Sequence, residues 1–216
     1  MPDSPKYPAK VKRSHAKIEE AAARVRTSMG KDPLDRVGGV EFLVWLGRQK
    51  ARIKGARLPI VYNVAPLSEA EAQARYQPEY KRIICELRPD TYDLLEQGDP
   101  RATHSAIHEG GHALLHPLEL LELESLPTRA RALRRGDFQH LKPYEDVEFQ
   151  AHSFAGAVRV PQAGLEILES RADLTTDSIV RIYGVSRAAA RVRLRIYEKY
   201  LRQSAAKARR PRSWNF

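Results

Sequence analysis

Residues 104–117 read HSAIHEGGHALLHP and contain the motif H-E-x-x-H at His108, Glu109 and His112. On a helix, side chains four residues apart lie on one face, with their Cβ atoms about 5–6 Å apart. Two imidazoles placed in this way can both reach one zinc ion, whose bonds to nitrogen are about 2.0–2.1 Å long. Glu109 projects toward the same cavity and can accept a proton from water activated by the ion. The stretch therefore predicts a metal-binding helix around which the rest of the chain is organised.

Apolar residues and a closing proline support a helix over this stretch. Its apolar flank consists of Ala106, Ile107, Ala113, Leu114 and Leu115. Pro117 ends the run, because proline cannot continue a helix. Gly110 and Gly111 conflict with this prediction, since each costs about 1 kcal/mol in a helix interior relative to alanine. We expect them to permit the close approach of a strand or of substrate.

The alternative to a metal site is a surface helix that happens to carry histidines. Four histidines follow one another at strict four-residue spacing: His104, His108, His112 and His116. A glutamate also stands next to the first histidine of the motif, where a general base is required. This combination favours the metal site.

Length and composition limit the classes of protein to consider. The chain has 216 residues, of which 42% are hydrophobic, so it forms one globular domain with an appendage or two small domains. It has no run of eighteen apolar residues, so we expect no membrane span. The first residues lack the apolar segment of a secretory signal. Cys85 is the single cysteine, which excludes an internal disulfide and favours the cytoplasm.

The formal net charge of +10 is concentrated at the C-terminus. Residues 181–216 carry nine Arg and two Lys against one Glu, an excess of 9 + 2 − 1 = +10. The middle of the chain is mildly acidic. The asymmetry predicts an acidic partner for the C-terminal region, which could be nucleic acid or an acidic protein surface.

The first part of the chain predicts a basic arm and two helices. Residues 1–13 alternate prolines with lysines and resemble a disordered arm. A helix is expected from Ser14, its N-cap, to about Gly30, so residues 1–30 form an arm and a helix. A second helix is expected from about residue 33 to residue 50, with Gly38-Gly39 as an interruption.

Two strands are expected before the histidine helix. Residues 58–64 (LPIVYNV) and 80–87 (YKRIICEL) are rich in β-branched and apolar residues. The segment between them, residues 66–78, is predicted to be a loop or one helical turn. A sheet edge beside the metal could hold an extended peptide. Together with the helices, these strands predict an α+β fold.

A third metal ligand is expected from a helix over residues 144–161. Glu148 shares the inward face of that helix with Ala151 and Phe154, and a carboxylate from a second helix commonly completes such a site. Glu145, one turn earlier, is the second choice. Acidic residues in a first turn also stabilise a helix without any metal. The long connection over residues 117–143 predicts a short helix and a loop over the cleft.

The C-terminal part predicts two helices joined by a tight turn, as in a helix-turn-helix unit. The first covers residues 177–183, the turn is Gly184-Val185-Ser186, and the second runs from Arg187 to about Ala206. Three arginines form one stripe on the second helix: Arg187, Arg191 and Arg195. Four apolar residues of the region are expected to pack inward: Val192, Leu194, Ile196 and Leu201. The stripe could lie along DNA phosphates, dock an acidic protein, or simply face solvent.

In combination these motifs resemble the ImmA/IrrE family of bacterial metallopeptidases. The resemblance covers about residues 58–197. It rests on the zinc motif with the trailing His116, on the stretch 148–155 (EFQAHSFA) with Val160-Pro161 after it, and on the turn at residues 183–186. His152 stands where relatives often carry asparagine. The organisation that follows is an arm and helix at 1–30, a zincin-like domain at 31–165, a helix-turn-helix-like region at 166–206 and a disordered basic tail at 207–216.

The resemblance implies a regulatory zinc endopeptidase. His108, His112 and Glu148 would be the metal ligands and Glu109 the general base, with Mn²⁺ as an alternative to Zn²⁺. The substrate would be a partner protein, a helix-turn-helix repressor encoded nearby, cut after stress or a mobile-element signal. His104, His116 and His152 are the candidates for a second donor to the oxyanion. His116 could instead orient a ligand or be a cation at the C-terminus of the helix.

Two other functions remain open. The protein could be a DNA-binding regulator whose zinc site is structural or vestigial. It could also be a toxin-type effector whose pocket binds a partner without cutting it.

Overall fold

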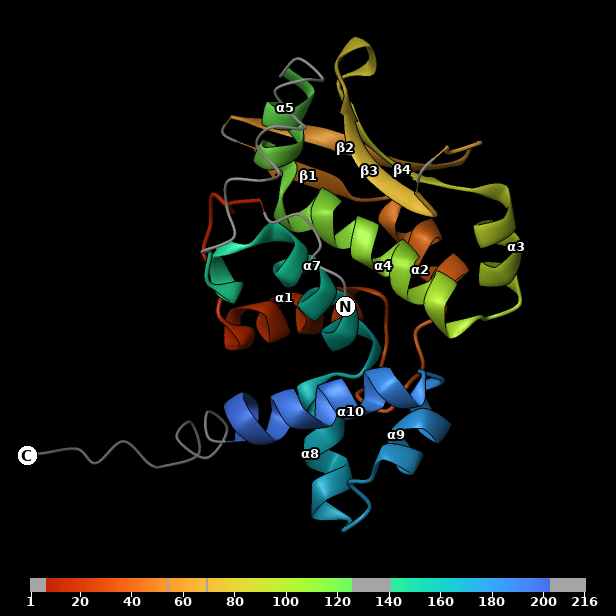
Figure 1. Ribbon diagram of the computed structural model, residues 1–216, viewed down its shortest axis with the longest axis vertical. Helices are drawn as coiled ribbons and strands as arrows, with labels where there is room; N and C mark the ends of the chain where they lie inside the picture. The colour runs from red at the N-terminus through yellow and green to blue at the C-terminus, as the bar shows by residue number, and fades with distance from the viewer. Residues whose placement is uncertain (1–6, 54, 69, 126–140, 203–216) are drawn as a thin grey trace, which may run out of the picture.

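The computed structural model describes residues 7–53, 55–68, 70–125 and 141–202. Figure 1 shows a small sheet at one end of the molecule, a layer of helices beneath it, and a helical region at the opposite end. The chain is therefore a mixed α+β protein, which confirms the predicted fold class. Within the described residues, no helix is both long and apolar enough to cross a membrane.

The sheet has four strands in the order β1-β2-β4-β3. They are β1 (Lys50–Ile53), β2 (Ala56–Val64), β3 (Ala72–Gln77) and β4 (Arg82–Leu87). β2 and β4, the two predicted strands, pair in parallel, while β1 and β3 are antiparallel to their neighbours. β4 is buried along five of its six residues, as expected for a central strand covered on both faces.

Helix α4 (Pro100–Leu115) carries the histidine motif and lies directly beneath the sheet (Figure 1). It packs against β3 and β4 above, against α2 (Gly39–Leu46) on one side and against α7 (Val147–Arg159) on another. α1 (His15–Ser28) covers the far side of α7. The fully buried side chains of Phe42, Ile60, Ile83, Ile107 and Phe154 form the centre of this core. The histidine helix α4 is thus held on several sides, which fixes the position of its histidines.

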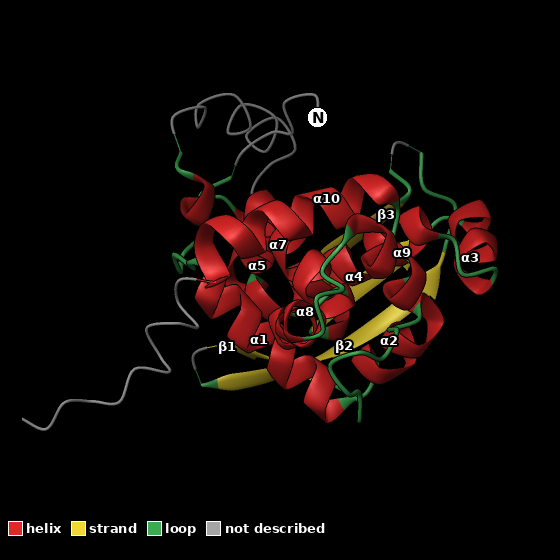
Figure 2. Ribbon diagram, turned by 90° about the horizontal axis from the view of Figure 1, so that it is seen from below, coloured by secondary structure: helices red, strands yellow, loops and turns green. Residues whose placement is uncertain are grey.

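The C-terminal helices lie together at one end of the molecule (Figure 1). Figure 2 shows the same helices from below, and a second hydrophobic cluster holds them together. Its elements are α8 (Gln162–Ser170), α9 (Thr176–Tyr183), α10 (Arg187–Ile196) and a π-helical turn (Tyr197–Leu201). Tyr183 and Tyr197 are its largest fully buried side chains. Gly184 adopts a left-handed conformation, with φ of 60°, and Ser186 caps α10 by accepting a hydrogen bond from Ala189 N. The predicted first helix and turn are confirmed at these positions. The predicted second helix corresponds to α10 and the π-helical turn, and the part of it predicted over residues 203–206 lies outside the described residues.

Two buried arginines connect the C-terminal helices to the rest of the molecule. Arg193 pairs with Glu19 of α1, with 2.7 Å between Nη2 and Oε1, and it also donates to the carbonyl of Val160. Arg159 donates from Nη1 to the carbonyl of Pro100 and from Nη2 to that of Gly184. These side chains link α1, α4 and α7 with the turn between α9 and α10.

The helix predicted over residues 33–50 is too long. Only α2 is helical, and residues 50–53 form β1 instead. Gly38 is extended, with ψ of 150°, and serves as the N-cap. The preceding residues are held as a loop because the Arg26 guanidinium binds the carbonyls of Asp32 and Asp35. The predicted interruption at Gly38-Gly39 is therefore the beginning of the helix.

The prediction of a loop or helical turn over residues 66–78 is also wrong. This segment contains β3, an edge strand whose partner β4 follows it in the sequence. Its alternate residues Ala72, Ala74 and Tyr76 pack on the core, while Gln73 and Arg75 contact Glu86 of β4. The alternation was present in the sequence, but alanine and glutamine favour strands weakly.

Two helices were not predicted, and one terminal segment is more ordered than expected. The helices are α3 (Pro89–Glu96), which starts with proline at N1, and α8. In the N-terminal segment Tyr7 is buried, Pro8 forms a β-bridge with Asp146, and Ala9 N donates to Glu145 O. Residues 7–13 therefore do not form the disordered arm that their composition indicated. The predictions for residues 1–6, the basic part of the 117–143 connection and the 207–216 tail lie outside the described residues.

Candidate metal centre

Helix α4 begins sharply, and this fixes the register of the histidine motif. Asp99 is the N-cap and accepts hydrogen bonds of 2.8 Å from the backbone of Arg101 and Ala102, and Pro100 occupies the first helical position. His108 and His112 are each 8% exposed. Both therefore project from one face of α4 into the space between α4 and α7.

Donor atoms of three residues converge in this space, and we call His108, His112 and Glu148 the donor triangle. The Nε2 atoms of His108 and His112 are 3.1 Å apart. Oε2 of Glu148 is 3.3 Å from Nε2 of His108, and Oε1 of Glu148 is 3.3 Å from Nε2 of His112. In a tetrahedral zinc site with bonds of about 2.0–2.1 Å, neighbouring donors lie about 3.3–3.4 Å apart. Two imidazole nitrogens and one carboxylate are also a donor set that zinc enzymes use. The three residues therefore fit a Zn²⁺ ion.

Glu145, the second choice for the third ligand, is engaged elsewhere. It lies in a 3₁₀ turn (Pro143–Glu145) before α7. One of its carboxylate oxygens is 2.7 Å from Nζ of Lys12, and the other accepts a hydrogen bond from Lys142 N. The geometry thus assigns the third position to Glu148 rather than Glu145.

Glu109 lies beside the donor triangle but outside it. Its Oε1 atom is 3.8 Å from Nε2 of His108, and its side chain is 13% exposed. A carboxylate at this distance is too far from the triangle to complete it, yet it can reach a water molecule near its open side. The placement is the one expected of a general base.

Glu148 and His112 stabilise each other's charged forms. Burial raises the pKa of the Glu148 carboxyl, but hydrogen bonds from His108 and His112 outweigh this and hold the pKa far below its usual range. Burial also disfavours the His112 imidazolium, yet contact with Glu148 raises the pKa of His112 above its usual value. A bound metal ion would take the place of the His112 proton beside Glu148 and leave the ring neutral.

Gln150 and His116 orient the ring of His112, and sequence reasoning missed the role of Gln150. The amide nitrogen of Gln150 donates to the carbonyls of Val11 and Tyr144, so its oxygen is the acceptor for Nε2–H of His116 at 3.1 Å. Burial lowers the pKa of His116 to about 3, so the ring is neutral and its Nδ1 accepts. The donor to that atom, 3.3 Å away, is Nδ1–H of His112.

This chain of hydrogen bonds determines the tautomer of His112. With its proton on Nδ1, the ring presents the lone pair of Nε2 to the donor triangle. His116 therefore lies behind the His112 ring, in a position from which it could orient a ligand, one of the three roles predicted for it. Arg13 supports the network by donating from Nη1 to the Gln150 oxygen at 2.9 Å. The signal available in the sequence was a glutamine two residues after the predicted ligand Glu148.

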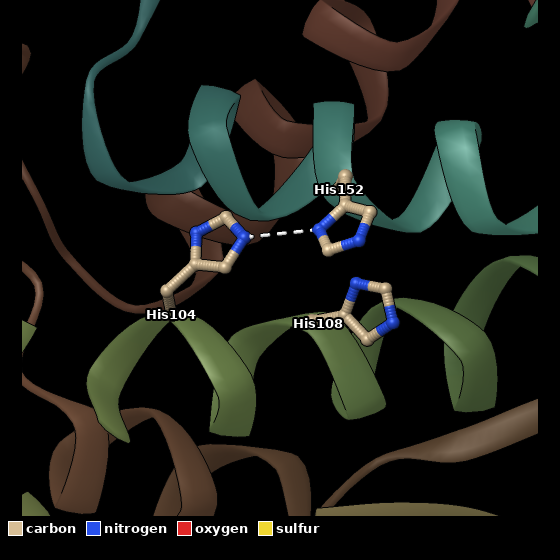
Figure 3. A group of neighbouring side chains, drawn as sticks. All are labelled: His104, His108 and His152. Carbon is tan, nitrogen blue, oxygen red and sulfur yellow. Dashed lines mark hydrogen bonds between the residues drawn. The ribbon is translucent and has the colours of Figure 1, made fainter. Parts of the chain in front are cut away.

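His104 and His152 lie on the other side of His108 (Figure 3). Nε2 of His104 is 3.2 Å from Nδ1 of His152, and the two rings are stacked with their centroids 5.5 Å apart. Burial lowers the pKa of His104 to about 3 and that of His152 to about 4. Both rings are therefore neutral near pH 7. The centroids of the His152 and His108 rings are 4.2 Å apart, so His152 lies directly beside a ring of the donor triangle.

Glycine is required at two positions of α4 for a reason different from the one expected. A Cβ on Gly110 would lie 2.4 Å from the Phe42 ring, and one on Gly111 would lie 3.0 Å from Phe154 and 3.6 Å from the Ala151 backbone. The close approach is thus made by α2 and α7, not by a strand or by substrate.

The arginine stripe of α10 is exposed along its whole length. Arg187, Arg191 and Arg195 are all exposed, and Arg187 pairs with Asp177 at 2.7 Å. Val192 is 50% exposed, so the prediction that it packs inward is wrong. The inward positions include Arg193, which the pattern did not identify. The stripe lies apart from the donor triangle, on the C-terminal helices.

No protein-family model matches the sequence, and no curated protein matches it. Among solved structures, a transcriptional regulator of Mycobacterium tuberculosis aligns with a TM-score of 0.45 and 17% sequence identity, over 84% of this chain and 46% of that chain. The present chain thus spans less than half the length of that protein. A likeness this weak carries no argument about function, so the candidate function rests on the site itself.

Proposed function

We propose that this protein is a zinc-dependent endopeptidase resembling the ImmA/IrrE family, with Mn²⁺ as the alternative metal. The observation that carries the proposal is the donor triangle of His108, His112 and Glu148, whose nitrogen and carboxylate oxygen atoms contact one another at 3.1–3.3 Å, with Glu109 beside it. A metal would polarise the substrate carbonyl and make water acidic enough to be deprotonated near neutral pH.

The residues around the triangle have separate roles in this proposal. Glu109 accepts the proton of the attacking water and later delivers it to the leaving amine. His116 and Gln150 hold His112 in the tautomer that binds metal. His152, 4.2 Å from His108 between ring centroids, is a candidate donor to the oxyanion, with His104 next to it.

The edge of the sheet offers a place for an extended substrate. β3 is the outermost strand on its side and pairs only with β4 within the described residues. It also packs against α4, which carries the metal ligands. A substrate segment could add to this edge by backbone hydrogen bonds and pass along the metal helix. The proposed substrate is a partner protein, a helix-turn-helix repressor encoded nearby.

The experiment combines metal analysis with cleavage of the candidate repressor. Full-length protein is loaded with Zn²⁺, its metal content is measured by mass spectrometry, and the repressor from the neighbouring gene is added. Wild type should bind zinc and cut the repressor at a defined bond. Glu109→Gln should retain zinc and lose cleavage, whereas Glu198→Gln, an exposed glutamate on the π-helical turn, should behave as wild type. Unchanged cleavage by Glu109→Gln would refute the general base.

A DNA-binding regulator is the second candidate, supported by the exposed arginines of α10 after a helix and a tight turn. In that case the zinc site would be structural or vestigial. Sequence-specific duplex binding without cleavage of any partner would favour this function.

A toxin-type effector would capture the partner intact, and mass spectrometry of the incubated mixture separates capture from cutting.

A further inference from the structure

Three histidines form a second cluster next to the donor triangle. His104 and His108 lie one turn apart on α4, and His152 faces them from α7 (Figure 3). Each ring offers a nitrogen, and the three nitrogens lie within 4.8 Å of one another. One pair of ring nitrogens, Nε2 of His104 and Nδ1 of His152, is 3.2 Å apart. That distance is close to the about 3.3–3.4 Å between neighbouring donors of a tetrahedral zinc site.

His108 provides the independent observation. Its Nδ1 atom is buried and has no hydrogen-bond partner among the described residues. Nε2 of the same ring contacts His112 and Glu148. The nitrogen that faces His152 in Figure 3 is therefore Nδ1, and it is aimed into the cluster. His108 as a whole is 8% exposed, so bulk water does not compensate this atom.

A buried nitrogen without a partner is costly. Leaving such a polar atom unsatisfied costs about 1–3 kcal/mol. Histidines that bind metal through one nitrogen almost always give the other to a carboxylate, a backbone carbonyl or water. Nδ1 of His112 has an acceptor in the His116 ring, whereas Nδ1 of His108 has no hydrogen-bond partner among the described residues and faces the rings of His104 and His152. A cation bound among the three rings would satisfy the atom.

We propose that His104, His152 and Nδ1 of His108 form a second transition-metal site, which shares the His108 ring with the site made by His112 and Glu148. When both sites are filled, His108 bridges two ions, and its Nδ1 proton is released to water. A set of imidazoles alone selects Zn²⁺, Co²⁺, Ni²⁺ or Cu²⁺ and binds Mg²⁺ and Mn²⁺ poorly.

The second ion would not be a co-catalytic partner of the first. Co-catalytic ions lie about 3.5–4 Å apart and share small bridging ligands. Ions on the two nitrogens of one imidazole are held on opposite sides of the ring and cannot approach so closely. The second site would instead bind its ion independently of the peptidase reaction, so it does not require that this protein cut any substrate.

The test counts metal equivalents in full-length protein stripped by a chelator and dialysed against Zn²⁺ or Co²⁺. Wild type should bind two equivalents. His104→Asn and His152→Asn should each retain one and weaken the second by more than about 100-fold, since loss even of a partner outside the coordination sphere costs about 10–100-fold. Glu148→Gln should weaken the other equivalent and leave this one. His15→Asn, on α1, is the matched control and should retain both.

Ring-nitrogen NMR identifies the ligand atoms directly. The second equivalent should shift the resonances of His104, His152 and Nδ1 of His108, and Mn²⁺ or Mg²⁺ should not compete for it. A single equivalent that survives His104→Asn and His152→Asn but is lost in Glu148→Gln would overturn the second site and leave the proposed peptidase centre intact. A single equivalent with the opposite dependence would support the second site and refute that centre. Absence of any bound metal would refute both.

Discussion

Gly110 lies so close to Phe42 that a Cβ on the glycine would be 2.4 Å from Cε1 of the ring. Real side chains do not tolerate such a distance, so α4 and α2 can pack in this way only if residue 110 is glycine. The histidines on the opposite face of α4 depend on that packing for their position relative to α7. The glycine thus contributes to the metal centre without touching it.

Gly110→Ala should therefore lower the free energy of unfolding. Overpacking a core typically costs about 1–3 kcal/mol, which exceeds the about 1 kcal/mol that alanine gains over glycine in a helix. Gly111→Ala is the comparison, because its nearest contact would be 3.0 Å from a Phe154 side-chain atom, and we expect a smaller loss. Urea denaturation measures both variants. Equal stability of Gly110→Ala and wild type would contradict the packing.

Removing the hydrogen-bond chain behind His112 should weaken metal binding. Gln150→Ala and His116→Ala leave the three ligands in place but release the tautomer of His112. Loss of such partners typically lowers metal affinity about 10–100-fold. Competition with a chromophoric chelator measures the zinc affinity. Gln162→Ala, a glutamine on α8 that hydrogen-bonds Glu166, is the control and should leave the affinity unchanged.

The ion pair between Arg193 and Glu19 should be essential to stability. Its side chains are 4% and 9% exposed, so Arg193→Ala leaves a buried carboxylate without its partner. Breaking such a pair costs about 3–5 kcal/mol. Arg191→Ala, on the exposed face of the same helix, should change stability by less than about 0.5 kcal/mol. In a double-mutant cycle, Glu19→Met with Arg193→Met should be less destabilising than the sum of the single changes.

Glu86 should make the protein less stable in acid. Hydrogen bonds from Arg75 lower the pKa of its carboxyl below the ordinary 4.5, against the effect of burial. The folded state therefore gains stability from ionised Glu86 above pH 4.5 and loses it as the pH falls through the lower folded pKa. Glu86→Gln should lower the free energy of unfolding at pH 7. It should also make the loss of stability below pH 4.5 less steep. Thermal unfolding from pH 7 to pH 3 provides the measurement, with the exposed Glu96→Gln as control.

If the C-terminal helices only assist a peptidase, their arginines should bind duplex DNA weakly and without sequence preference. Each arginine that contacts a phosphate contributes about 0.9 to the slope of log K against log salt. Changing Arg187, Arg191 and Arg195 together to alanine should reduce this slope. Changing three exposed arginines near the sheet, Arg48, Arg52 and Arg57, removes the same charge and should have little effect. A strong preference for one operator sequence would favour the DNA-binding regulator.

Local signals predicted the parts of the molecule that depend on short sequence spacing. Ser14 and Ser186 are N-caps as expected, and the four-residue spacing of His108 and His112 does place them on one face of α4. For the caps and the histidine pair, the decisive contacts lie within one or two helical turns. The inward face of the helix over residues 144–161 indicated Glu148, and its two carboxylate oxygens lie 3.3 Å from Nε2 of His108 and of His112, respectively.

Features that depend on distant partners could not be read from the sequence. β3 forms because β4 provides its hydrogen bonds, and residues 7–13 are ordered by contacts with Asp146 and Glu145 far along the chain. The burial of Arg193 could not be predicted either, since its partner Glu19 lies on α1. In the sequence, Arg193 cannot be distinguished from the exposed arginines of α10.

The guanidinium of Arg159 has a practical consequence for anyone who shortens this protein. It holds the first residue of α4 with one nitrogen and the turn before α10 with another. A fragment that stops near residue 165 would leave half of that buried cation unanchored, directly beneath the beginning of the histidine helix. Recombinant fragments intended for crystallisation or assay should therefore extend through residue 202, and shorter ones should be expected to precipitate.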